Sequence, residues 1–107
     1  MSGDTPVAVS DNREKSRFEA VLDGQTAVVE YNLSPGRMLI AHTEVPVEIE
    51  GRGVASRLYA KVIETARAEG LILIPVCPVF ALWLKRHEEV HDLIDPGFRR
   101  SLGLSPG

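Results

Sequence analysis

Residues 51–53, Gly-Arg-Gly, carry the first spacing in the sequence that indicates a particular chemistry. They stand between an apolar segment with strand alternation and a stretch whose apolar residues recur at helical spacing. The first N–H groups of a helix have no partner inside it, and the helix dipole adds roughly half a positive charge there. The turn is therefore predicted to bind an anion, a phosphate ester being the best match. The alternative is a plain strand-to-helix turn with solvated arginines.

Cys77 is the only cysteine of the chain, and it precedes Pro78, which is favoured at the first position of a helix. A thiol between a strand end and a helix start lies where the helix dipole favours the thiolate. It is a candidate nucleophile. The alternative is a small, buried, unreactive side chain that lines a pocket or fills the core.

His42 lies near the end of a predicted strand, in phase with Met38 and Ile40, and Glu44 shares its face. Histidine titrates near neutral pH and can remove a proton from an amine. We therefore consider His42 as a general base and Glu44 as a group that attracts a cationic amine or relays the proton. The alternatives are a core histidine and a solvated glutamate.

His87 and His91 have the spacing of a metal-binding pair on a helix. No third ligand is evident in the sequence around them, and the segment follows a predicted helix end. We expect no metal site.

Three consecutive strands are predicted to position these residues, at 17–22, 26–33 and 37–45. The turns between them contain Asp23-Gly24 and Ser34-Pro35-Gly36, which are typical of hairpins. Such short connections indicate an antiparallel meander.

After the meander the pattern changes to a helix at residues 54–69, and Gly70 follows as its left-handed cap. The apolar run 71–76 is predicted to be a strand buried on both faces, next to the centre of the sheet. It pairs in parallel with the third strand through a right-handed crossover. A second helix covers 78–86, and 87–96 forms a polar connection.

The fold class is therefore α+β: a three-strand antiparallel meander, a helix, a parallel strand and a C-terminal helix. Residues 1–16 are expected to be a mobile N-terminal tail, because they show no periodicity. Residues 17–96 form the folded domain, and residues 97–107 are expected to be a loosely held C-terminal tail.

Composition excludes several classes of protein. The formal net charge of -3 leaves no general electrostatic attraction for nucleic acid. No apolar run approaches the roughly 20 residues that cross a bilayer. The single cysteine cannot form an internal disulfide, and the N-terminus lacks the apolar core of a signal peptide, so we expect a cytoplasmic protein. The oligomeric state is left open.

The segment Glu50-Gly51-Arg52-Gly53-Val54-Ala55 resembles the pyrophosphate-binding motif R/Q-x-x-G-x-G/A of the GNAT superfamily of acetyltransferases. The order of elements also matches that fold, and the chain is similar to a group of very small GNAT-like proteins. The resemblance covers roughly residues 17–94. It is carried by the segments His42-Thr43-Glu44-Val45-Pro46, Gly51-Arg52-Gly53-Val54-Ala55-Ser56, Pro75-Val76-Cys77-Pro78 and Lys85-Arg86-His87. One departure is Glu50, a carboxylate where the superfamily usually has Arg or Gln.

The resemblance implies a minimal GNAT fold with acetyl-CoA as the cofactor. The third strand would separate from the fourth, and the pantetheine arm would bond to backbone in the gap. The pyrophosphate would lie on the amides of residues 52–57. Lys85 and Arg86 are expected to complement the C-terminus of the second helix, and the alternative is that they meet the adenosine phosphates of the cofactor. The implied cofactor-binding residues are Thr43, Val45, Arg52, Gly53, Val54, Ala55, Ser56, Arg57, Lys85 and Arg86; the catalytic candidates are Cys77, His42 and Glu44.

The function that follows is transfer of an acetyl group from acetyl-CoA to an amine, which is a protein lysine, an N-terminus or a small amine. Direct attack by the amine with His42 as base is the first mechanism, and prior acetylation of Cys77 is its variant. The alternatives are a CoA-binding module with little or no catalysis and a purely structural interaction domain.

Overall fold

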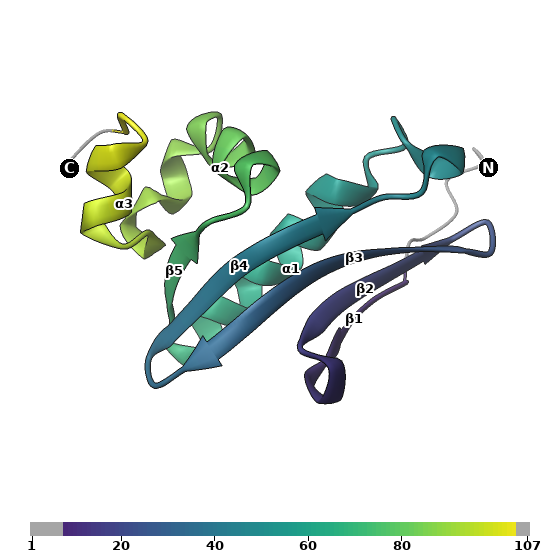
Figure 1. The fold of residues 1–107 in the computed structure, drawn as a ribbon, viewed down its shortest axis with the longest axis horizontal. Helices are drawn as coiled ribbons and strands as arrows, with labels where there is room; N and C mark the ends of the chain where they lie inside the picture. The colour runs from purple at the N-terminus through teal and green to yellow at the C-terminus, as the bar shows by residue number, and fades with distance from the viewer. Residues whose placement is uncertain (1–7, 105–107) are drawn as a thin grey trace.

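A five-stranded sheet forms the centre of the computed structural model, which describes residues 8–104 (Figure 1). The strand order is β1-β2-β3-β4-β5, antiparallel except for the parallel pair β4 and β5. The strands are β1 Ala8–Asn12, β2 Arg17–Leu22, β3 Gln25–Ser34, β4 Arg37–Glu44 and β5 Ile72–Pro75. The α-helices are α1 Val54–Glu69, α2 Pro78–Lys85 and α3 Pro96–Ser101, and 3₁₀ turns cover Arg13–Lys15, Val47–Ile49 and Glu88–Leu93.

The predicted meander is confirmed as strands β2, β3 and β4. At the β2–β3 turn Asp23 and Gly24 have φ of 51° and 74°. Positive φ at both central residues defines the tight turn whose twist matches that of paired strands. The sequence predicted this hairpin because its turn requires residues that adopt positive φ.

Helix α1 begins and ends where the apolar periodicity predicts. Its buried stripe includes Leu58, Val62 and Ala66, and it packs on the first three strands, behind the sheet in Figure 1. Gly70 has φ of 67° and ends the helix with a left-handed cap, as predicted. The helix connects β4 to β5 as a crossover, which is why these two strands are parallel.

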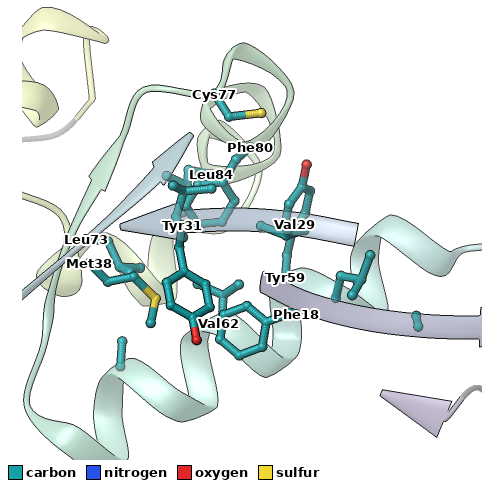
Figure 2. Packing of buried hydrophobic residues seen from close by; sticks show 14 of the residues in the cluster. Phe18, Val29, Tyr31, Met38, Tyr59, Val62, Leu73, Cys77, Phe80 and Leu84 are labelled. Carbon is teal, nitrogen blue, oxygen red and sulfur yellow. The ribbon is translucent and has the colours of Figure 1, made fainter. Parts of the chain in front are cut away.

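An apolar core lies between the sheet and the helices (Figure 2). Strand side chains such as Phe18 and Met38 meet Val62 of α1 and Phe80 and Leu84 of α2 there. No helix among residues 8–104 is long and apolar enough to cross a membrane.

The prediction of a mobile tail over 1–16 is wrong for residues 8–16, and residues 1–7 lie outside the described part. Strand β1 pairs antiparallel with β2, and its Asp11 carboxylate accepts a hydrogen bond of 2.5 Å from the Tyr31 hydroxyl. An edge strand held by backbone pairing and polar side chains needs little apolar alternation, so the period-two signal was absent.

The prediction of a loosely held tail over 97–107 is also wrong as far as residue 104; residues 105–107 lie outside the described part. Asp95 caps α3 by accepting from the N–H groups of Gly97 and Phe98 at 3.0 and 3.3 Å. Phe98 and Leu104 pack against the core. The N-cap carboxylate and Pro96 at the first helical position were readable signals for this helix.

The expected place of the fourth predicted strand in the sheet is corrected as well. Strand β5 is the last strand in the order, extended only by an isolated parallel bridge between Leu73 and Ile94. Its outward residues Ile72 and Ile74 are half-buried, not fully buried. An apolar run alone does not distinguish a central strand from an edge strand that neighbouring segments cover.

Candidate functional site

Strands β4 and β5 separate near their carboxyl ends. They pair in parallel from Arg37 opposite Ile72 to Ile40 opposite Pro75, and the Cys77 N–H then donates to the Ile40 carbonyl at 2.9 Å. Strand β4 continues to Glu44 after β5 has ended, as Figure 1 shows. Within residues 8–104 no strand pairs with this last part of β4 on the β5 side. Its backbone groups there are available to a ligand.

A cavity of about 350 Å³ opens at this point, between the end of β4 and the N-terminus of α1. It brings together six of the predicted cofactor-binding residues, namely Thr43, Val45, Gly53, Val54, Ala55 and Ser56. The other residues that line it are Ile49, Glu50, Gly51 and Val79. Val79 of α2 was not predicted, because only the fold places α2 opposite β4.

The N-terminus of α1 faces this cavity without a side-chain cap. Gly53 is the N-cap residue, with φ of 78°, and it offers no side chain to the first amides of the helix. Gly51 has the same φ, in a region where a Cβ atom is strained. Free amides at the positive end of a helix dipole favour an anion. Anion binding at this helix N-terminus stays a prediction.

The predicted cationic residues lie around the cavity and do not line it. Arg52 forms an ion pair of 3.0 Å with Asp23 of the β2–β3 turn. Arg57 lines a separate hollow along α1. Arg86 lines a hollow of about 180 Å³ between α1 and α2, which shares Ala55 and Val79 with the main cavity. Lys85 is exposed on the last turn of α2.

Three polar groups meet where β4, α1 and α2 converge. The Thr43 Oγ1 atom lies 2.7 Å from the Tyr59 hydroxyl and 3.4 Å from the Cys77 Sγ atom. Figure 2 shows the Tyr59 hydroxyl pointing toward Cys77, while the Tyr31 hydroxyl points the opposite way. Burial of the Tyr59 phenol raises its pKa to about 12, despite the opposing effect of the Thr43 hydrogen bond. The thiol of Cys77 is buried and does not line the cavity, whereas Thr43 does.

Sequence reasoning missed Tyr59 and the Thr43 side chain. Tyr59 lies in the predicted helix 54–69, where its spacing indicates only a core position, and Thr43 was expected to act through its backbone. A buried tyrosine hydroxyl normally has a polar partner, so an aromatic stripe residue with a hydroxyl was a usable signal.

His42 does not lie on the face predicted from strand alternation. In β3 and β4, Glu30 is opposite His42 but the next residue, Tyr31, is opposite Ile40, so Ala41 is an extra residue on β4. This bulge reverses the alternation, which turns Thr43 to the core face and His42 to the outer face. The His42 side chain is 55% exposed, and its Nε2 atom lies 3.6 Å from a carboxylate oxygen of Glu44.

His87 and His91 have separate surroundings. The His87 ring stacks on Trp83 with centroids 3.9 Å apart, and its Nδ1 atom lies 3.1 Å from the Glu89 carboxylate. The buried His91 donates from Nε2 to the Leu84 carbonyl at 2.6 Å. Across residues 8–104 no group of three or more potential ligands is arranged to hold a metal ion.

A sheet that opens between two parallel strands, beside an uncapped helix N-terminus, is the architecture expected of an acetyltransferase from the sequence resemblance. The chain belongs to the GCN5-related N-acetyltransferase family, because the family's sequence pattern, described as GCN5-related N-acetyl-transferase, matches residues 17–93. The matched residues include every element from β2 to α2 and all the residues that line the main cavity. Comparison with curated proteins gave no match to this chain.

Proposed function

We propose that this protein transfers an acetyl group from acetyl-CoA to an amine. The observation that supports this most is the cavity in which the unpaired edge of β4 meets the uncapped N-terminus of α1. An extended pantetheine arm is able to bond along a free strand edge as an added strand does. A pyrophosphate is suited to the free amides beside Gly53. Both binding modes are available in one cavity of this fold.

The two ends of acetyl-CoA would then take different parts of the site. The pantetheine would lie along Thr43 and Val45, and the pyrophosphate would lie on the amides of residues 53–56. Arg86 would meet the adenosine phosphates, because the hollow that it lines shares Ala55 and Val79 with the main cavity. Lys85, the preceding residue, would add charge there. Arg52 and Arg57 would supply charge from the rim.

The chemistry would be direct attack of a neutral amine on the thioester carbonyl. Because the bulge turns His42 outward, the amine would approach from the outer face of the sheet, where His42 takes its proton. Glu44 lies beside His42 and also lines a groove of about 530 Å³ on that face. Its carboxylate would attract the cationic form of an acceptor, which is a protein lysine, an N-terminus or a small amine.

Cys77 is assigned to the wall behind the thioester in this proposal. Cys77 is 2% exposed, and its thiol contacts Thr43 instead of the cavity. The variant in which Cys77 is acetylated first requires the thiol to reach the cavity. Cys77→Ala separates the two routes: retained turnover removes the covalent route, and complete loss with intact acetyl-CoA binding supports it.

The decisive experiment measures binding and transfer separately. Calorimetry with acetyl-CoA tests the cavity, and thioester loss with a panel of amines and lysine peptides tests transfer. Ala55→Leu fills the cavity and should abolish binding; Ala68→Leu, at an exposed position of the same helix, should not. Absence of binding by the natural chain would contradict the proposal. An unchanged pH–rate profile in His42→Ala would contradict the base assignment.

A CoA-binding module with little catalysis is the second candidate, and one observation favours it. Glu50 lines the cavity, where its carboxylate opposes the phosphates that the family motif normally attracts. Binding without turnover on the whole panel would support this alternative.

A further inference from the structure

The Thr43 hydroxyl is a side-chain hydrogen-bonding group on the β4 side of the main cavity. Among the described residues that line the cavity, the polar side chains are those of Thr43, Glu50 and Ser56. Ser56 lies in the first turn of α1, at the phosphate end, and an ionised Glu50 can only accept. A thioester placed at the end of β4 would therefore meet Thr43 as its side-chain donor.

The contact with Tyr59 constrains the direction in which Thr43 can donate. The Tyr59 side chain is 1% exposed, and the Thr43 Oγ1 atom, 2.7 Å away, is its hydrogen-bond partner. A tyrosine hydroxyl is protonated at neutral pH, and a buried hydroxyl proton needs an acceptor. Within residues 8–104, Thr43 is the acceptor found for it. Either oxygen could be the donor in this contact, and the direction in which Tyr59 donates to Thr43 is the one that gives the buried phenol proton an acceptor.

The proton of Thr43 remains free for a third group. A threonine oxygen has two lone pairs and one proton, so it can accept from Tyr59 and from the weak S–H donor of Cys77 at 3.4 Å. In this arrangement the O–H of Thr43 is left for the cavity that Thr43 lines.

We infer that Thr43 donates a hydrogen bond to the thioester carbonyl oxygen of the acyl donor, and that Tyr59 is the positioning residue that orients Thr43 for this contact. The inference rests on the proposed function for the identity of the donor. It places a side-chain donor beside the thioester carbonyl, where negative charge develops as the amine attacks. Such a donor strengthens as negative charge develops on the oxygen, so it lowers the barrier more than it tightens binding.

A spectroscopic test does not depend on turnover. Acetyl-CoA carrying a ¹³C-labelled carbonyl is bound to the natural chain, to Thr43→Val and to Tyr59→Phe, and the carbonyl band is recorded by isotope-edited infrared spectroscopy. A hydrogen bond from Thr43 lowers the stretching frequency, so the band should lie lowest in the natural chain and highest in Thr43→Val. The same frequency in the natural chain and in Thr43→Val would overturn the inference, even if the protein proves to be an acetyltransferase.

A kinetic test measures whether the effect of Tyr59 on kcat depends on Thr43. Thr43→Val should lower kcat about 100-fold, with the Kd of acetyl-CoA within about threefold of the natural value. Tyr59→Phe should lower kcat by about tenfold, and the double variant should be no worse than Thr43→Val, because Tyr59 acts only through Thr43. Thr43→Ser should retain most of the activity. Additive effects in the double variant would overturn the role of Tyr59.

Two matched controls separate this effect from damage to the core. Tyr31→Phe removes a buried tyrosine hydroxyl that donates to Asp11, away from the cavity. Thr65→Val removes the hydroxyl of a buried threonine on α1. Both should keep the natural kcat and carbonyl frequency; a loss in these controls equal to that in Thr43→Val would also overturn the inference. If the natural chain binds acetyl-CoA but transfers nothing, the proposed function fails, while the infrared comparison still decides the role of Thr43.

Discussion

The Thr43 Oγ1 atom lies 2.7 Å from the Tyr59 hydroxyl, and this hydrogen bond joins the end of β4 to the first half of α1. The two residues belong to the elements that form opposite walls of the cavity. A polar bond at this junction fixes the distance between the strand edge and the helix N-terminus. The buried tyrosine thus connects the apolar core to the candidate site.

The ionisation of the tyrosines can be predicted from this arrangement. The chain has two tyrosines, and burial raises the pKa of Tyr59 to about 12 and also raises that of Tyr31, with a further contribution from its bond to Asp11. Ultraviolet absorbance of the native protein should therefore show no phenolate near pH 10, whereas the protein in denaturant should titrate there.

The same shifts predict a loss of stability in alkali. Folded pKa values above the unfolded value mean that the stabilisation is complete below about pH 10 and is lost as pH rises through the folded values. Tyr59→Phe should lose less free energy of unfolding than the natural chain between about pH 10 and 12. Normal tyrosine titration in the native state would show that the hydroxyls are not buried as described.

Substitution of Glu50 should increase the affinity for acetyl-CoA. Glu50→Gln removes a negative charge from the cavity wall and restores an amide that the family motif accepts. It should tighten acetyl-CoA binding by about threefold to tenfold, an effect that calorimetry measures and that salt reduces. Glu48→Gln, at an exposed position of the same loop, is the matched control and should bind as the natural chain does. Equal affinities in all three proteins would mean that the phosphates lie away from Glu50.

Removal of β1 should leave the edge of β2 unpaired and prone to association. A chain that begins at Arg17 loses the pairing of β1 with β2 and the acceptor of the Tyr31 hydroxyl. Its unfolding midpoint in urea should fall, and β2 should become an open edge that associates with other copies. Gel filtration and urea denaturation measure both effects. A monomer of unchanged stability would support the original expectation of a tail over residues 1–16.

The cap of α3 should contribute measurably to stability. Asp95→Ala leaves the N–H groups of Gly97 and Phe98 without their acceptor and should lower the free energy of unfolding by about 1 kcal/mol. Asp95→Asn keeps an acceptor but removes the charge that faces Arg37 at 3.5 Å, so it should retain most of the stability. Ser101→Ala, exposed at the end of the same helix, is a control. No difference between Asp95→Ala and Asp95→Asn in chemical denaturation would contradict a capping role.

Local patterns in the sequence determined most of the fold. The Asp23-Gly24 turn, the stripe of α1 and the cap at Gly70 depend on a few neighbouring residues, and the structure confirms each of them. The glycines at 51 and 53 likewise predicted the helix N-terminus that lines the cavity. Such features can be predicted from the sequence because residue type and short-range periodicity set their backbone conformation.

The tertiary structure alone decided which side chains meet at the site. The bulge at Ala41 arises from the register between β3 and β4, and one extra residue was enough to move His42 to the outer face and Thr43 to the cavity. The meeting of Thr43, Tyr59 and Cys77 joins three elements that are distant in the chain. Pairing register and helix packing are non-local, so no spacing within the sequence contains them.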